Sequence, residues 1–379
     1  MGEPVSPSAH FDRLSVVWPR ENFLKTKSES GGVMRQLTFI EPGKLEWWDV
    51  PAPKIVAGTD AIVRPLAVAR CDLDYSTIIG SGLQGGPFAF GHETAGEVVE
   101  VGDQVTSVKV GDKVIVPFQI SCGTCDNCRQ GWTNACKSVT RGAVYGMKPI
   151  CGEEFGGALS EFMHVPFADH MLVPLPDDIR PEVLAGGSDN IADAWRTVAP
   201  HMDKYEAPSV LVIGSGRGIG LYALQIALAR GAKRVVYAEI GKGGEAMRMA
   251  KEIGAEVQQV PSASDIKSLG SFNITVDSSG DMEGTKLAIR STGSNGTCTS
   301  NSVPFDNAVP FPMTAMYTKG ISFHTSRVQG RALLPQIVEE VKCGHFHPEK
   351  VTTREVSFSD AAEAMDDPAP KIVFTNDWV

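Results

Sequence analysis

Four cysteines in one short run have the types and the spacing of a metal site. Cys122, Cys125, Cys128 and Cys136 are separated by two, two and seven residues, and thiolates this close in sequence can converge on one tetrahedral Zn²⁺. The glycine, aspartate and asparagine residues between them favour turns that let the segment wrap around an ion. A closed shell of four thiolates leaves no position for a substrate, so we predict a structural zinc. The spacing leaves a disulfide pair and an iron–sulfur cluster open as alternatives.

A second, looser set of potential ligands is spread along the chain. In order, its members are Cys71, Asp74, His92, Glu93 and Asp189. A cysteine, then Gly-His-Glu, then the four-cysteine run and then a dinucleotide fold make a specific combination. In this order of motifs the chain resembles the zinc-dependent alcohol dehydrogenases of the medium-chain dehydrogenase/reductase superfamily, from about residue 34 to the C-terminus.

The resemblance implies a catalytic zinc held by Cys71, His92 and Asp189. It also implies that Glu93 lies beside the metal or exchanges with a ligand, and that Asp74 orients the ring of His92. Three protein ligands leave a fourth position, where zinc acts as a Lewis acid on an alcohol or carbonyl oxygen. The residues alone leave another interpretation of Asp189, which precedes a helical pattern and would cap that helix.

A glycine-rich turn lies between two apolar runs in the second half of the chain. Residues 209–214 read as a buried strand, and residues 234–238 as a second one that ends before Glu239. The turn and the start of the helical pattern carry Gly214, Gly216, Gly218 and Gly220. Glycines let the backbone approach a pyrophosphate at a helix N-terminus, and the acid at the second strand binds the ribose. We therefore predict NAD as the cofactor and leave NADP open.

Lys371 bears on cofactor binding, and Leu73 bears on how the substrate proton leaves the site. The resemblance places Lys371 near the cofactor pyrophosphate, and a solvated strand-end lysine is the alternative. Leu73 stands where relatives that oxidise simple alcohols usually carry Ser or Thr, so the hydroxyl that would pass on the substrate proton is missing. Asp72, Tyr75, Ser76 or water would have to replace it. Leu73 also favours a bulky, apolar substrate.

Together these motifs predict an enzyme with two zinc ions per chain. It would transfer hydride between a nicotinamide cofactor and an alcohol, an aldehyde or a ketone. The missing hydroxyl keeps a reductase of conjugated C=C or C=N bonds open, and a non-catalytic cofactor-binding relative is a further alternative. Because the family forms dimers and tetramers, we expect a homodimer or a homotetramer.

The predicted fold class is α/β, with two domains that follow the change in sequence pattern. Residues 34–190 have short alternating runs broken by Gly and Pro, and the family places a partly open β-barrel catalytic domain here, with the structural-zinc lobe at about residues 120–138. Residues 191–325 alternate strands and helices, which predicts a doubly wound parallel (Rossmann) sheet. The resemblance implies that residues 326–379 return to the catalytic domain. Residues 1–33 are an extension with no assigned role.

The composition sets wider limits on function. Hydrophobic residues make up 42% and charged residues 21% of the chain, as in ordinary globular proteins. The net charge of −10 argues against a nucleic-acid partner, which would need a basic surface. No apolar run is long enough to span a membrane, and no secretory signal pattern opens the chain. The clustered cysteines suit a reducing compartment, so we expect a cytoplasmic protein.

Overall fold

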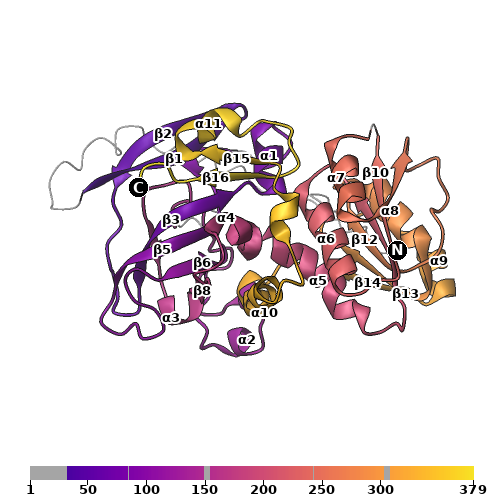
Figure 1. Cartoon of the computed structure of the whole chain (residues 1–379), viewed down its shortest axis with the longest axis horizontal. Helices are drawn as coiled ribbons and strands as arrows, with labels where there is room; N and C mark the ends of the chain where they lie inside the picture. Colours follow the sequence, from indigo (N-terminus) through magenta and orange to yellow (C-terminus); the bar gives the residue numbers. More distant parts are fainter. Residues whose placement is uncertain (1–31, 84, 149–153, 242, 303–307) are drawn as a thin grey trace, which may run out of the picture.

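The computed structural model describes residues 32–83, 85–148, 154–241, 243–302 and 308–379. The predicted extension therefore lies outside the described residues, apart from its last two positions. The described chain forms two lobes side by side, and each lobe is built on its own β-structure (Figure 1). None of the helices in these ranges is long and apolar enough to cross a membrane.

The first lobe is rich in strands, as its short alternating runs predict. Its strands are β1 (Val33–Glu41), β2 (Lys44–Pro51), β3 (Ala61–Ala69), β4 (Phe88–Ala89), β5 (Glu93–Val101), β6 (Lys113–Val116), β7 (Met163–Val165), β8 (Val173–Pro174), β15 (Arg354–Ser357) and β16 (Ile372–Thr375). They form a three-stranded sheet in the order β2-β1-β4 and a larger sheet in the order β15-β16-β3-β5-β6-β8, with β7 paired to β3. One face of these strands encloses an apolar core that includes Phe39, Val63, Val98 and Phe374.

The C-terminal segment returns to this lobe. Strand β16 pairs antiparallel with β3, with Val373 opposite Ala69. Strand β3 ends just before Cys71, so the pairing carries Lys371 from the far end of the chain to the segment that holds the first potential metal ligand.

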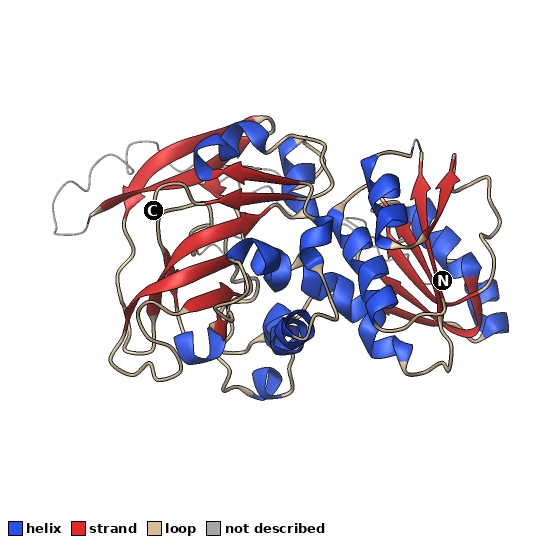
Figure 2. Cartoon of the chain, viewed as in Figure 1, coloured by secondary structure: helices blue, strands red, loops and turns tan. Residues whose placement is uncertain are grey.

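The second lobe is a parallel sheet covered by helices on both faces (Figure 2). Its strands are β9 (Ser209–Gly214), β10 (Arg234–Ile240), β11 (Glu256–Val260), β12 (Phe272–Ser278), β13 (Thr292–Ser300) and β14 (Ser322–Thr325), in the order β11-β10-β9-β12-β13-β14. The covering helices include α6 (Gly218–Ala229), α7 (Glu245–Ile253), α8 (Met282–Ser291) and α9 (Met313–Lys319). Strand β9 is apolar along nearly its whole length because a parallel strand is buried on both faces.

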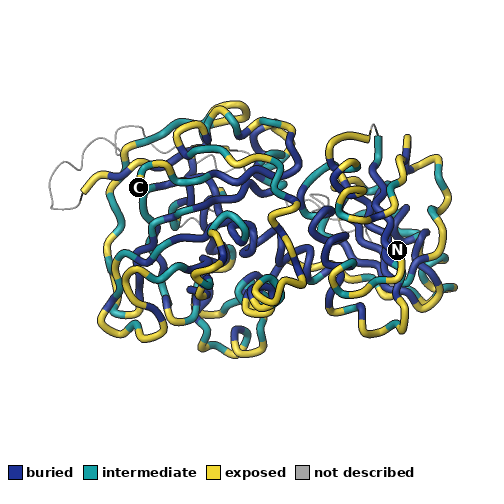
Figure 3. The backbone as a smooth tube through the Cα atoms, viewed as in Figure 1, coloured by how far each residue is buried: buried dark blue, intermediate teal, exposed yellow. Residues whose placement is uncertain are grey.

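Helices α5 (Asn190–Met202) and α10 (Gly330–Lys342) lie at the junction of the lobes. One apolar cluster contains Ile115 of the first lobe, Val212 of the second and Ile337 of α10, so the two lobes share a continuous core. Figure 3 shows buried segments in both lobes, with exposed turns around them. We retain the domain boundaries given above as a proposal.

The remaining helical segments are short. They are α1 (Asp72–Ile78), α2 (Asp126–Arg129), α3 (Ala168–Met171), α4 (Pro181–Leu184), α11 (Ala361–Ala364) and the 3₁₀ turns Thr133–Ala135, Ala185–Ser188, Pro348–Val351 and Phe358–Asp360. Several of them carry residues of the sites described next.

Candidate active site

Three segments that are far apart in sequence bring a thiol, an imidazole and a carboxylate together. Cys71 is the N-cap residue of α1, His92 directly precedes β5, and Asp189 directly precedes α5. The donor atoms of these three buried residues all lie within 4.8 Å of one another. The Cys71 thiol donates to Oδ2 of Asp189 at 3.1 Å, and Nε2 of His92 lies 3.2 Å from the same oxygen.

Asp189 occupies the N-cap position of α5 without capping that helix. Its side chain makes no hydrogen bond to the first-turn amides and turns instead towards Cys71 and His92. The interpretation of Asp189 as an ordinary helix cap is therefore wrong.

The three donors fit a zinc ion. Sulfur, imidazole nitrogen and carboxylate oxygen are the ligand types that Zn²⁺ takes in proteins, and three of them leave a fourth position open. Burial, followed by the charges of Asp189 and Glu93, raises the pKa of Cys71 well above its usual value. A divalent cation at this point would favour the thiolate, because its charge offsets both effects. The role of these residues as ligands is our proposal.

Asp74 contacts two members of the set. Its Oδ2 accepts the backbone N–H of Cys71 at 3.0 Å, which closes the capping box of α1. Its Oδ1 lies 3.4 Å from Nδ1 of His92, but Nδ1 has no hydrogen-bond partner in this structure. Asp74 thus fixes the backbone of Cys71 directly, and the orientation of the His92 ring by Asp74 stays a prediction.

Glu93 belongs to a buried polar network behind the three donors. Its Oε2 accepts from Nζ of Lys371 at 2.5 Å, and its Oε1 accepts the backbone N–H of Asn190 at 2.5 Å. The side-chain amide of Asn190 donates to Sγ of Cys71 at 3.2 Å and accepts from Lys371 at 2.6 Å. In the sequence, the only signal for Asn190 is its place next to Asp189. Glu93 is not among the grouped donors, so its role beside the metal stays a prediction.

Lys371 is fully buried, and its ammonium has three partners in this network. Besides Glu93 and Asn190, it donates to the carbonyl oxygen of Arg70 at 2.8 Å. Burial disfavours the ammonium, but the nearby Glu93 carboxylate helps to hold the pKa of Lys371 above its usual value. The solvated-lysine alternative is therefore wrong. Only the stem of Lys371 approaches the glycine turn, so its contact with a pyrophosphate stays a prediction that requires the ammonium to move.

Two positions of the glycine turn require glycine. A Cβ on Gly214 would lie 2.2 Å from the hydroxyl of Tyr237, and Gly216 has a φ of +77°, which favours glycine. Helix α6 begins at Gly218, and a Cβ on Gly220 would meet the ring of Tyr237 at 3.4 Å. A turn without side chains at these positions fits the close approach of a dinucleotide phosphate, and the role of these glycines in binding it is our proposal.

Glu239 lies beside the turn on β10. Its Oε1 would be 3.6 Å from a Cβ on Gly216, and its side chain is only 6% exposed. Burial raises the pKa of Glu239. This position suits an acceptor of ribose hydroxyls, which stays a prediction.

Asp72 joins the glycine turn to the three donors. Its carboxylate accepts the backbone N–H groups of Gly218 and Ile219, at 3.2 and 3.3 Å. These amides open helix α6, and Asp72 directly follows Cys71 in the sequence. The potential metal site and the potential phosphate site are therefore neighbours in space.

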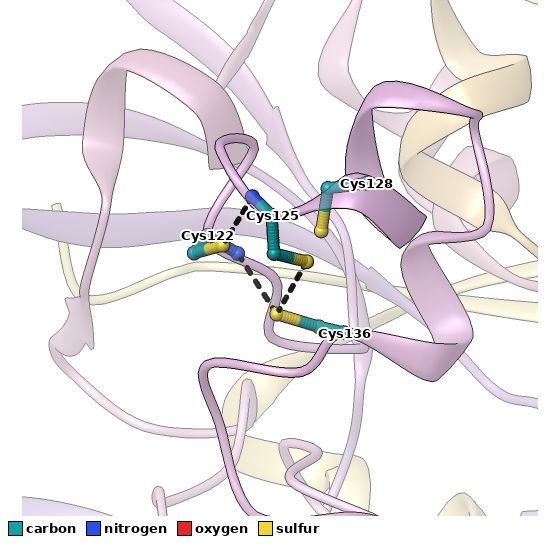
Figure 4. A group of neighbouring side chains, drawn as sticks. All are labelled: Cys122, Cys125, Cys128 and Cys136. Carbon is teal, nitrogen blue, oxygen red and sulfur yellow. Dashed lines mark hydrogen bonds between the residues drawn. The ribbon is translucent and has the colours of Figure 1, made fainter.

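The four cysteines of the short run converge, as Figure 4 shows. The sulfurs of Cys122, Cys125, Cys128 and Cys136 lie within 4.8 Å of one another. Helix α2 and the 3₁₀ turn Thr133–Ala135 wrap the segment around them. This set fits a structural zinc, because four thiolates complete its tetrahedral shell.

Local hydrogen bonds favour the thiolate at Cys122 and Cys125, whereas burial raises the pKa of Cys128. Backbone N–H groups of Cys125, Lys137 and Ser138 donate to three of the sulfurs, each at 3.4 Å. Burial opposes ionisation, but hydrogen bonds that include those of Ser138 and Thr124 lower the pKa of Cys122 to about 5. All four cysteines are free in this structure, so the disulfide alternative is wrong.

Comparisons with protein families cover both lobes. Residues 57–177 match the alcohol dehydrogenase GroES-like domain, and residues 218–342 match the zinc-binding dehydrogenase domain. Zinc-type alcohol dehydrogenase B of Aspergillus flavus is 29% identical over 334 residues, which cover 83% of this chain and 74% of the relative. The uncharacterized zinc-type alcohol dehydrogenase-like protein AdhB of Bacillus subtilis is 35% identical over 199 residues, about half of each chain.

Solved structures share the two-lobed fold. The alcohol dehydrogenase TADH from Thermus sp. ATN1 superposes with a TM-score of 0.81 at 24% identity, and the match covers 90% of this chain and 99% of that one. Benzyl alcohol dehydrogenase from Acinetobacter calcoaceticus gives a TM-score of 0.78 at 20% identity, covering 91% and 99%.

Proposed function

Since this chain belongs to the zinc-dependent alcohol dehydrogenases of the medium-chain dehydrogenase/reductase superfamily, we propose that it transfers hydride between a nicotinamide cofactor and an alcohol or the corresponding carbonyl compound. One observation carries this proposal. Cys71, His92 and Asp189 meet at the lobe junction, next to a glycine turn to which Asp72 connects them. Hydride transfer needs the nicotinamide and a polarised substrate oxygen at adjacent places, and this arrangement would suit both.

The residues of the chain hold this site in position. A zinc bound by Cys71, His92 and Asp189 would supply Lewis-acid polarisation of the substrate oxygen. Asn190 fixes the sulfur of Cys71, and Lys371 fixes Asn190. A second zinc in the four-cysteine lobe would stabilise the fold without touching the substrate.

Ser76 and Asp72, two of the side chains that could replace the missing hydroxyl, are already engaged in hydrogen bonds. The Ser76 hydroxyl donates to the carbonyl oxygen of Asp72 at 3.1 Å, and the Asp72 carboxylate accepts the α6 amides. The guanidinium of Arg217 lies 3.5 Å from the centre of the Tyr75 ring. These contacts support water as the proton acceptor. The absence of a hydroxyl at Leu73 also keeps a C=C or C=N reductase as the second candidate.

The charge of Glu239 favours NAD over NADP, because it repels a 2′-phosphate. Arg248 does not offset this charge, since its guanidinium pairs with Glu245 at 3.2 Å and with Glu252 at 2.9 Å. Lys242, which could also do so, lies outside the described residues.

An exposed edge of the second sheet bears on how copies of the chain associate, and the free cysteines bear on where the protein is found. We expect a homodimer or a homotetramer, because β14 is the edge of its sheet and the adjacent helix α9 exposes Met313 and Tyr317, 63% and 87% accessible. Free cysteines in both metal-type clusters favour a reducing compartment such as the cytoplasm.

The decisive experiment combines an assay with metal analysis. Purified protein is tested with primary, secondary and aromatic alcohols, each with NAD⁺ and with NADP⁺, and its zinc content is measured. We expect alcohol-dependent reduction of NAD⁺ and two zinc ions per chain. Turnover of conjugated C=C or C=N substrates without alcohol oxidation would favour the reductase, and one zinc without turnover would favour a non-catalytic relative.

A further inference from the structure

A carboxylate of the chain itself occupies the start of helix α6. Oδ1 of Asp72 accepts the backbone N–H of Gly218 at 3.2 Å, and Oδ2 accepts that of Ile219 at 3.3 Å. Two oxygens of one anion therefore bind the first two amides of the helix, as two oxygens of a phosphate group would. The contact joins the lobes, because Asp72 belongs to the first lobe and α6 to the second. The start of α6 is thus an anion site that the chain itself fills.

Arg217 is the N-cap residue of α6 and directly precedes these two amides. Its guanidinium carbon lies 3.5 Å from the centre of the Tyr75 ring, and Nη1 donates to the carbonyl oxygen of Pro368 at 3.0 Å. Tyr75 follows Asp72 by three residues on α1, so the ring that Arg217 covers is one turn away from the carboxylate. Among the described residues, Nε and Nη2 of Arg217 have no hydrogen-bond partner. These two nitrogens are available to a phosphate oxygen.

The charge of Arg217 acts on two parts of the proposed cofactor site. Burial raises the pKa of Asp72, and Arg217 is among the groups that oppose this rise. Burial also raises the pKa of Glu239, the proposed acceptor of ribose hydroxyls, and Arg217 opposes it there too. In a dinucleotide the pyrophosphate adjoins the adenosine ribose. A cofactor that reached from the α6 amides to Glu239 would therefore have Arg217 beside its pyrophosphate.

A second arginine, Arg70, holds the loop that Arg217 contacts. Its guanidinium donates to three carbonyl oxygens of that loop, those of Met365, Asp367 and Ala369. Arg70 is only 3% exposed, and burial, followed by the charge of Arg217, lowers its pKa to about 10. Since Arg70 is fully engaged, Arg217 is the member of this pair that can take a new partner. A phosphate beside Arg217 would also offset the repulsion between the two guanidinium groups.

We propose that Arg217 binds the cofactor pyrophosphate, and that Asp72 occupies the place of that group until the cofactor displaces it. The phosphate oxygens take the amides of Gly218 and Ile219, and Arg217 donates to the same group. Guanidinium suits this contact because it donates in a fork that matches phosphate oxygens. The inference rests on the proposed dehydrogenase activity and specifies how the chain holds the cofactor for it.

A cofactor ligand and a simple tie between the lobes predict opposite results when Arg217 is replaced. In Arg217→Gln we expect the Kd for NADH to rise by about tenfold or more, because a charge-assisted hydrogen bond is lost. If Arg217 only held Asp72 and the lobes in place, the same variant would release the α6 amides and tighten NADH binding. Fluorescence titration with NADH measures the change, and tighter or unchanged binding would overturn the inference.

Competition against NADH locates the contact on the cofactor. ADP-ribose carries the pyrophosphate without the nicotinamide, and adenosine carries neither. We expect Arg217→Gln to weaken the binding of ADP-ribose by about tenfold or more and to leave that of adenosine unchanged. Equal losses for both compounds would indicate a general disturbance of the site and would refute the assignment.

Two further variants separate the charge of Arg217 from its packing. Arg217→Lys keeps the charge without the fork, so its Kd for ADP-ribose should lie between those of the wild type and Arg217→Gln. A Kd equal to that of Arg217→Gln would contradict a contact through charge. In an Asp72→Asn background, Arg217→Gln should weaken NADH binding at least as much as it does alone. Disappearance of the loss there would mean that Arg217 acts only through Asp72.

Arg234→Gln is the matched control. Arg234 is exposed at the start of β10, at the opposite end of the strand from Glu239, and pairs with Glu256 at 2.7 Å. Its replacement removes the same charge from the same lobe and should leave the Kd for NADH unchanged. A wild type that binds no NADH and oxidises no alcohol would overturn the dehydrogenase proposal itself. A wild type that does both, with Arg217→Gln binding NADH equally well, would overturn only the inference about Arg217.

Discussion

The carboxylate of Asp72 accepts the backbone N–H of Gly218, at 3.2 Å, across the junction of the two lobes. A second amide, that of Ile219, donates to the same carboxylate at 3.3 Å. An amide pair at a helix N-terminus is where a dinucleotide phosphate is expected to bind. The Asp72 carboxylate thus occupies the place at the start of α6 where a cofactor phosphate is expected. Asp72 directly follows the proposed zinc ligand Cys71 in the sequence.

Asp72→Asn should tighten NADH binding. The substitution keeps an oxygen acceptor for Gly218 but removes the negative charge that competes with the cofactor phosphate. Loss of an anion at a helix N-terminus should also cost about 0.3–1 kcal/mol of stability. Fluorescence titration with NADH and thermal unfolding measure the two effects, and unchanged zinc content is the control for Cys71. Weaker NADH binding would show that the cofactor uses Asp72 as a partner.

Asp189→Asn should lower turnover sharply while NADH affinity changes little. The substitution removes the charge that Asp189 presents to Cys71 and His92, but it leaves the glycine turn intact. Steady-state kinetics, NADH titration and zinc analysis check the expectation, with loss of one zinc equivalent as the direct signature. Near-normal turnover at full zinc content would show that Asp189 is not the third zinc ligand, and Glu93 would then be the next candidate.

Cys128→Ser should release one zinc equivalent and lower the melting temperature. Cys128 is buried among the sulfurs of the lobe, and metal binding at such a site contributes directly to folding stability. Exposed Cys343 is not part of either cluster, so Cys343→Ser is the matched control and should keep both zinc ions. The assignment of the lobe would be refuted by a Cys128→Ser protein that retains two zinc ions and the melting temperature of the wild type.

Leu73→Ser should raise alcohol oxidation at neutral pH. Positioned groups that accept a proton typically accelerate such steps by about 10²–10⁴-fold, and Leu73 has no exchangeable proton. The gain should shrink at alkaline pH, where solvent accepts the proton readily. The measurement is kcat against pH for both proteins on the best alcohol found. A wild type that is already fast at pH 7 with a flat profile would reveal another acceptor.

Asp169→Asn should destabilise the protein near pH 7 and lose this effect in acid. Burial opposes ionisation, but hydrogen bonds from the backbone and hydroxyl groups of Thr106 and Ser107, each at 2.8 Å, lower the pKa of Asp169 to about 2. A depressed pKa contributes stability above the unfolded-state value of about 3.9. The contribution is lost as the pH falls from there towards 2. Urea unfolding of both proteins between pH 7 and pH 3 should show the difference in midpoint narrowing below about pH 4.

The features that can be predicted from the sequence are those whose parts lie close together along the chain. Cys122, Cys125, Cys128 and Cys136 span one short segment, so turn chemistry alone brings their sulfurs near one another. The strand, glycine turn and helix from Ser209 onwards are also local: β9 lies at residues 209–214, as the apolar run predicts. The spacing of the hydrophobic residues and the conformational freedom of the glycines determine such elements locally, without contacts to the rest of the fold.

Tertiary structure decided the contacts between distant segments. Cys71 meets Asp189 across 118 positions, and Lys371 meets Glu93 across 278. Such pairings depend on sheet register and on how the lobes pack, which no local pattern encodes. The resemblance to a family suggested the three donors, but it did not reveal Asn190 in the buried network or the α6 amides bound by Asp72. The side-chain amide of Gln119 is buried without a hydrogen-bond partner among the described residues, and this too is visible only after folding, because a missing partner is a property of the packed interior and not of the residue.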